Sequence, residues 1–188
     1  MNHIQIYDNA LPKESCRNII KYFDNHPDIG DVSFNGMYDT KGRRKKEIKN
    51  GTSLTFEFNS LPDCMNMLIP TLSIGIEKYK KKFTELNELR NWNLTRDFNV
   101  QRFIGKEEGY FARHCEADGY GGTNSRMLVW MIYLNNAKCG TRFYDPRRDI
   151  RAKEGRLVIW PAFWTHPHSG ITPNIGRKYL MTGWWCFY

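Results

Sequence analysis

The sequence predicts an α+β fold that is mainly β, in which a jelly roll follows supporting helices. Segments 12–26 and 62–83 carry apolar residues at helical spacing. From residue 93 onward, short runs of β-branched and aromatic residues alternate with turns of Gly, Asn and Asp, a pattern typical of a jelly roll. The 188 residues suit one domain with a sizeable core. We therefore expect a single domain, residues 1–188, with helical support over about 1–92 and a β core over about 93–188.

The two expected helices differ in how proline bounds them. The first is predicted over Pro12–His26, because proline suits the first turn of a helix. The second is predicted over Pro62–Phe83, with Pro70 as a break or kink. The second helix has an apolar stripe that is typical of core packing, formed by Met65, Met67, Leu68, Leu72 and Ile76.

Much of the net charge of +8 lies in two basic runs, residues 41–46 with Lys49 and residues 78–83. Such runs attract polyanions, but they are also typical of solvated loops and of the wet faces of helices. No recognisable nucleic-acid motif accompanies them, so we favour the solvated surface and keep nucleic acid as the alternative partner. Residues 41–51 are then expected to form a flexible loop, a candidate lid near the substrate.

Targeting signals and cysteine usage indicate the compartment. No stretch approaches about 20 apolar residues, and the N-terminus lacks the layout of a signal peptide. We expect a cytoplasmic protein without a membrane partner. The five cysteines form no CxxC pair, which fits free thiols in a reducing compartment.

A His-x-Glu pair, His114 and Glu116, and the distant His168 carry the chemistry. Side chains two apart on an extended strand point to the same face, so His114 and Glu116 can bind one ion together. Two histidines and one carboxylate occupy one face of Fe(II) and leave positions open for a co-substrate and dioxygen. A lone His-x-Glu recurs by chance, and its histidine is then more often structural. The three residues together predict an iron site.

Lys178 stands ten residues after His168, at the start of an apolar and aromatic run, 179–188, that predicts a buried strand. An ammonium in an apolar setting is costly without an anionic partner, which a dicarboxylate co-substrate would supply. The alternative is that Lys178 extends to water at the start of the strand.

These four residues resemble the pattern of the Fe(II)/2-oxoglutarate-dependent dioxygenases, most closely the prolyl 4-hydroxylase-like branch. Other segments are similar to the family's opening strand and helix, its central strand, its Gly-Gly-x-Thr-x-Phe segment and the strand before the distal histidine, namely 7–20, 127–135, 139–143 and 155–160. The resemblance covers roughly residues 1–26 and 95–188. It implies a double-stranded β-helix as the core.

The resemblance also implies cofactors and roles. His114, Glu116 and His168 would bind Fe(II), while Lys178, helped by Thr141, would hold the distal carboxylate of 2-oxoglutarate. Dioxygen is the second co-substrate and ascorbate a candidate reductant. The implied reaction hydroxylates a substrate and releases succinate and carbon dioxide.

The substrate is a separate question, because fold and cofactor do not determine it. A prolyl residue in a protein or peptide is the leading hypothesis, by analogy with the family. The alternatives are a free amino acid or another small metabolite, and a jelly-roll module that binds a metal or ligand without turnover. The oligomeric state is not predicted.

Three positions depart from the family's pattern. Glu116 replaces the usual aspartate, and Arg142 stands where an acidic residue is usual. Phe103 takes the position of a tyrosine that hydrogen-bonds the co-substrate in many relatives, and Tyr110 is the candidate replacement.

His166 competes with His168 for the metal, since both lie on one face of an extended segment. The context and spacing of His168 match the family, so His166 is interpreted as a hydrogen-bonding neighbour. The candidates for contact with the substrate are therefore Trp164, Arg113, His166 and Arg142.

Overall fold

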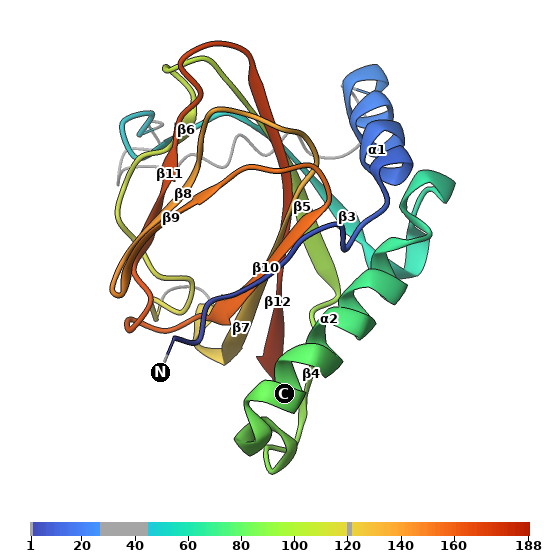
Figure 1. Ribbon diagram of the computed structural model, residues 1–188, viewed down its shortest axis with the longest axis vertical. Coiled ribbons are helices and arrows are strands. Elements are labelled where there is room, and N and C mark those ends of the chain that lie inside the picture. Colours follow the sequence, from blue (N-terminus) through green and yellow to red (C-terminus); the bar gives the residue numbers. More distant parts are fainter. Residues whose placement is uncertain (1, 27–44, 120–121) are drawn as a thin grey trace.

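The computed structural model describes residues 2–26, 45–119 and 122–188. Two β-sheets face each other, and the helices cover the outer face of the larger sheet (Figure 1). This arrangement confirms the predicted jelly roll with supporting helices. No helix in the described part of the chain is long and apolar enough to span a bilayer.

The larger sheet contains seven strands among the described residues, in the order β1-β10-β7-β12-β5-β3, with β4 paired to β12. The paired strands are antiparallel. Their bounds are β1 Gln5–Tyr7, β3 Thr52–Glu57, β4 Trp92–Leu94, β5 Asp97–Ile104, β7 Arg126–Tyr133, β10 Arg156–Pro161 and β12 Arg177–Phe187.

The opposite layer has two parts. One is the sheet β11-β8-β9, and the other is the pair β2-β6. An isolated antiparallel bridge joins His114 to His168, the first residue of β11, so the metal motif itself continues this layer. The bounds are β2 Lys49–Asn50, β6 Gly109–Tyr110, β8 Gly140–Tyr144, β9 Arg147–Arg151 and β11 His168–Ile171.

Helix α1 spans Lys13–Asn25, as predicted to within one residue at each end. Helix α2 spans Leu68–Lys82 and follows a short 3-10 turn, Asp63–Met65. Pro70 therefore lies in the first turn of α2, where a missing backbone N–H costs no helical hydrogen bond. The break in the second helical segment comes before Pro70 and not at it. The remaining 3-10 turns are Phe58–Ser60, Thr84–Asn87 and Thr123–Ser125.

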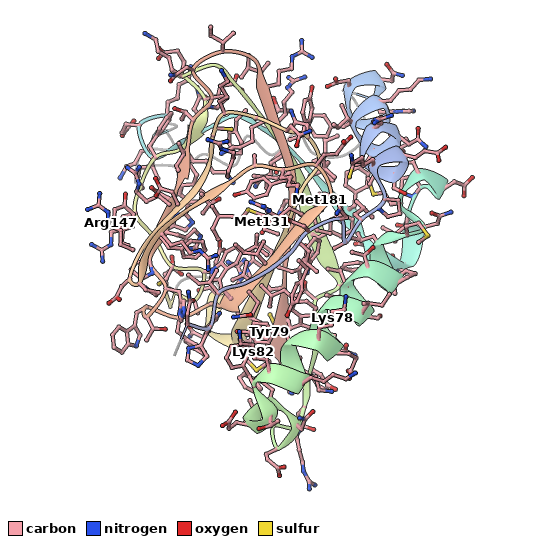
Figure 2. The ribbon with its side chains drawn as sticks, in the orientation of Figure 1. Lys78, Tyr79, Lys82, Met131, Arg147 and Met181 are labelled. Atoms are coloured by element: carbon pink, nitrogen blue, oxygen red, sulfur yellow. The ribbon has the colours of Figure 1, made fainter. Side chains whose placement is uncertain are left out.

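Strand alternation divides the core into two layers. Along β7, Trp130 and Ile132 belong to the cluster under the helices, whereas Met131 and Tyr133 belong to the cluster between the sheets. Figure 2 shows Met131 within the barrel and Arg147 at its outer edge. Because β7 is buried on both faces, its sequence is almost continuously apolar.

Strands also occur in the segment expected to be helical support. Strand β3 pairs with β5 and places Leu54 and Phe56 in the cluster under the helices. Strand β2 lies within the expected lid segment, 41–51, and pairs with β6. Residues 41–44 of that segment lie outside the described ranges. Such edge pairings depend on a distant partner strand, which a local pattern does not reveal.

Candidate metal centre

His114 and His168 are positioned by the strand bridge that joins them. The backbone N–H of each donates to the carbonyl of the other, at 2.9 and 2.8 Å. The Nδ1 of His114 lies 2.9 Å from the Ala112 carbonyl, and that of His168 lies 3.0 Å from the His166 carbonyl. A carbonyl accepts a hydrogen bond, so each Nδ1 carries a proton and each Nε2 is the ring nitrogen that can bind a metal. Both histidines could therefore hold a metal ion through Nε2.

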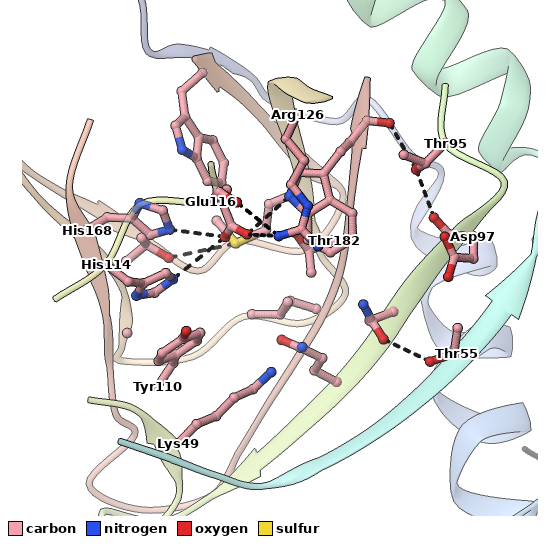
Figure 3. Close-up of a pocket in the computed structure, with 18 of the residues that line it drawn as sticks. Lys49, Thr55, Thr95, Asp97, Tyr110, His114, Glu116, Arg126, His168 and Thr182 are labelled. Atoms are coloured by element: carbon pink, nitrogen blue, oxygen red, sulfur yellow. Dashed lines mark hydrogen bonds and ion pairs between the residues drawn. The ribbon is translucent and has the colours of Figure 1, made fainter. Parts of the chain in front are cut away.

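Glu116 completes the group. Its Oε1 lies 3.7 Å from the His114 Nε2 and 3.4 Å from the His168 Nε2. The possible ligand atoms of the three residues all lie within 4.8 Å of one another. They face a cavity of about 610 Å³ between the sheets (Figure 3). The three side chains thus present their possible ligand atoms to one cavity.

The second oxygen of Glu116 is held by two side chains. The Trp184 indole donates to Oε2 at 3.1 Å, and Arg126 Nη1 donates at 3.4 Å and also to the Glu116 carbonyl at 3.0 Å. The Arg126 guanidinium lies 3.7 Å from the Trp184 ring centroid. Burial favours the neutral acid, but His114 and His168 outweigh it and hold the Glu116 pKa well below its usual range. Glu116 is therefore a carboxylate, the form that binds a metal.

Tyr110 covers one side of His114. The two rings stack at 3.6 Å between centroids with an interplanar angle of 9°. Burial, with the charge of Glu116, raises the Tyr110 pKa to about 12, so the phenol stays protonated. Tyr110 lines the cavity and can donate a hydrogen bond there.

Lys178 also lines the cavity and is only 1% exposed. Its Nζ donates to the carbonyls of Gly140 and Ile171, at 3.2 and 3.1 Å, and lies 5.0 Å from the Phe103 ring centroid. Burial lowers its pKa to about 8. Of the ion pairs between described residues, none includes Lys178. The site therefore fits an anionic ligand, which would return a counter-ion to this buried ammonium.

Thr141 lines the cavity from β8. Its hydroxyl accepts a hydrogen bond of 2.7 Å from the Tyr133 phenol, while its own proton has only the Met131 sulfur, at 3.8 Å, as acceptor. A thioether is a weak acceptor, so the Thr141 proton is available to a ligand. Phe103 provides an apolar wall beside Lys178, with no polar atom for a ligand.

The four candidates for contact with the substrate are not among the residues that line this cavity. Trp164 is 79% exposed, and Arg113 lies over the Tyr144 ring at 4.9 Å. Arg142 forms two hydrogen bonds to Asp149, at 2.8 and 2.7 Å. His166 is buried beside Thr165, and burial lowers its pKa to about 4. Its hydrogen bond and burial match the structural interpretation of His166.

Sequence reasoning missed several residues of the site. Arg126 and Trp184 contact Glu116 from strands β7 and β12, and Lys49 enters the cavity from a basic segment that the sequence predicts to be solvated. A charged residue at the start of an apolar strand, as Arg126 is, was the one available signal. The others depend on cross-strand register.

The comparisons with known proteins agree with this geometry. The family model described as "2OG-Fe(II) oxygenase superfamily" matches residues 98–186. None of the curated proteins compared is significantly similar in sequence.

Several solved structures share the fold. A viral collagen prolyl hydroxylase from Paramecium bursaria chlorella virus-1, in a 2OG complex, has 14% identity and a TM-score of 0.69, covering 100% of this chain and 97% of that one. A prolyl-4-hydroxylase from Pseudomonas putida has 13% identity and a TM-score of 0.70, with coverages of 100% and 94%. A prolyl hydroxylase from Trichoplax adhaerens, in complex with a hypoxia inducible factor peptide fragment, has 17% identity and a TM-score of 0.69, with coverages of 100% and 84%.

The family match spans the β core that carries all three clustered ligands and Lys178. The chain is therefore similar to the 2OG-Fe(II) oxygenase superfamily over residues 98–186, and its fold is similar to that of prolyl hydroxylases.

Proposed function

We propose that this protein is an Fe(II)- and 2-oxoglutarate-dependent dioxygenase that hydroxylates its substrate and releases succinate and carbon dioxide. One observation carries the proposal. The metal-binding atoms of His114, Glu116 and His168 converge within 4.8 Å, and the cavity that they face also holds the buried ammonium of Lys178. 2-Oxoglutarate can chelate a metal and carries a second carboxylate, so it fits a cavity that holds three possible metal ligands and the ammonium of Lys178.

Each residue has a defined task in this proposal. His114, His168 and Glu116 would hold Fe(II), which with 2-oxoglutarate and dioxygen supplies the oxidising chemistry. Lys178 and the Thr141 hydroxyl would bind the distal carboxylate of 2-oxoglutarate. The carbonyls of Ala112 and His166 keep the histidine protons on Nδ1. The cavity, about 610 Å³, has room for the co-substrate and a small part of a substrate.

The finer proposal is a prolyl residue in a protein or peptide as the substrate. Its support is the similarity of fold to prolyl hydroxylases, one of which was solved with a peptide fragment. A free amino acid or small metabolite is the second candidate. The fold alone does not separate them, since a similar structure at 11% identity is an epimerase, SnoN.

Anaerobic titration of the purified protein with Fe(II) and then 2-oxoglutarate tests the proposal. We expect a weak visible charge-transfer band when the co-substrate chelates the iron, and succinate release when dioxygen is admitted. His168→Ala should abolish the band.

His166→Ala is the matched control, because His166 is also buried but contributes no atom to the clustered ligands. It should retain the band. Iron binding without a band in the wild-type protein would contradict a 2-oxoglutarate enzyme and favour the module without turnover. Loss of the band in His166→Ala alone would contradict the ligand assignment.

A further inference from the structure

A lysine that the metal centre does not use, Lys49, projects into the same cavity. Strand β2 pairs with β6 so that Lys49 lies directly opposite Tyr110, and directly opposite side chains in a pair of strands stand on one face. The Lys49 Nζ lies 5.2 Å from the Tyr110 ring centroid, and that ring stacks on His114. Figure 3 shows Lys49 on the opposite side of the cavity from Arg126. The pairing of β2 with β6 therefore places Lys49 beside Tyr110, whose ring stacks on the proposed metal ligand His114.

The Lys49 ammonium is not neutralised by the part of the chain that the structure describes. Its side chain lines the cavity, and none of the ion pairs between described residues includes it. Burial lowers its pKa to about 8, although the charge of Glu116 raises it. A charge withdrawn from water in this way is stabilised when an anion binds beside it.

Neutral donors line the same cavity. Gln101 in β5 is only 7% exposed, and its amide has no hydrogen bond to another described residue. Gln101 lines the cavity, so a ligand or water there can bond to its amide. Two positions along β5, the Asn99 carbonyl oxygen accepts a hydrogen bond of 3.1 Å from Thr55. Its N–H groups are thereby left as donors.

Cross-strand register gathers these polar groups. Thr55 of β3 and Thr182 of β12 both lie opposite Asn99 of β5, and Ser53 lies opposite Gln101. These polar side chains, except that of Ser53, line part of the cavity, whereas the interior of a small barrel is usually filled by apolar side chains. A polar lining stabilises a polar ligand and disfavours a purely apolar one.

We propose that Lys49, with the amides of Gln101 and Asn99, binds a carboxylate of the substrate. This inference rests on the proposed function, which puts the substrate in the cavity beside the metal. One ammonium with neutral donors matches a single negative charge. The carboxylate has two sources that this chemistry does not distinguish, the α-carboxylate of a free amino acid and an acidic side chain next to the target residue of a peptide.

The test compares acids with their neutral amides by calorimetric titration of protein loaded with Mn(II) and 2-oxoglutarate. The probe pairs are acetate and acetamide, N-acetylproline and N-acetylprolinamide, and the peptides acetyl-Pro-Asp-amide and acetyl-Pro-Asn-amide. We expect at least one acid to bind roughly tenfold more tightly than its neutral partner, as a charge-assisted hydrogen bond would give. A preference in the N-acetylproline pair indicates an α-carboxylate, and a preference in the peptide pair indicates an acidic side chain. A preference in the acetate pair shows carboxylate binding without identifying its source.

Variants assign the preference to Lys49. Lys49→Met should abolish it and Lys49→Arg should retain it. Lys46→Met is the matched control, because Lys46 is an exposed lysine of the same segment and does not line the cavity. Gln101→Leu, which retains the lysine, should reduce the preference and serves if Lys49→Met fails to fold.

The proposal is overturned if each acid binds like its neutral partner, or if Lys49→Met keeps the preference. Failure of the proposed function looks different, since the protein would then not load with Mn(II) and 2-oxoglutarate. In that case the acetate and acetamide pair, titrated into the unloaded protein and the Lys49→Met variant, still decides whether Lys49 binds a carboxylate.

Discussion

The Trp184 indole donates a hydrogen bond of 3.1 Å to Oε2 of Glu116, and the other oxygen of the same carboxylate faces the two histidines. Strand β12 therefore orients a ligand that belongs to a distant loop.

Trp184→Phe should weaken Mn(II) binding roughly tenfold, because groups that hydrogen-bond to metal ligands typically contribute 10–100-fold to affinity. The phenyl ring can still pack against Arg126, so the loss measures the hydrogen bond. Electron paramagnetic resonance of free Mn(II) gives the dissociation constant.

Trp185→Phe is the control, because Trp185 belongs to the cluster under the helices. An equal loss of affinity in Trp184→Phe and Trp185→Phe would indicate general destabilisation and contradict a specific role of Trp184.

Lys178→Met should weaken 2-oxoglutarate binding by roughly 10–100-fold, since a hydrogen bond to a charged group contributes about 1.5–3 kcal/mol. Mn(II) binding should not change, because Lys178 is not one of the clustered ligands. Calorimetric titration of 2-oxoglutarate into Mn(II)-loaded protein measures the effect. Lys138→Met, at an exposed lysine, is the control, and unchanged 2-oxoglutarate affinity in Lys178→Met would refute the role of Lys178.

The affinity for 2-oxoglutarate should depend on pH above about 8. Burial lowers the Lys178 pKa to about 8, so the free protein loses the positive charge above that pH. Only the protonated lysine binds the distal carboxylate well, so affinity should be constant below pH 8 and then fall by up to about tenfold per pH unit. A pH-independent affinity up to pH 10 in the wild-type protein would contradict the prediction.

In the protein without 2-oxoglutarate, the contribution of Lys178 to the free energy of unfolding should rise with pH. Lys178 has a pKa of about 8 when folded and an ordinary one, about 10.4, when unfolded. Between these values the unfolded chain binds more protons, so this lysine makes the free energy of unfolding rise with pH, by at most about 1.4 kcal/mol per unit.

Urea denaturation of wild type and Lys178→Met at pH 7.5 and 9.5 isolates this contribution. The buried cysteines oppose it, because burial raises their pKa values, but they are common to both proteins. The stability of wild type relative to Lys178→Met should therefore rise with pH. A constant or falling difference would show that Lys178 is not a buried ammonium in the folded protein.

Local patterns were sufficient for much of the fold. The apolar spacing in 12–26 predicted α1, and the apolar and aromatic run 179–188 predicted a buried strand, which is part of β12. These elements are recognisable because helical and strand periodicity are properties of neighbouring residues. The second helix was predicted too long at its start, since the sequence does not reveal that a 3-10 turn precedes Leu68.

The site was partly legible in the same way. His114 and Glu116 are two residues apart and His168 and Lys178 ten apart, so the family's spacing could be recognised along the chain. Their roles as ligands and as the co-substrate's counter-ion remain predictions that the experiments above test.

The sequence by itself predicted the fold class, from helix and strand patterns and from a family resemblance, and it named His114, Glu116, His168 and Lys178 as candidates. Only the tertiary structure decided that Trp184 and not Trp164 reaches the metal centre, and that Lys49 lines the cavity instead of extending into solvent. Both outcomes follow from strand register, β12 against β7 and β2 against β6. A shift of one residue would turn each side chain to the other face, and register is fixed by strands distant in the sequence.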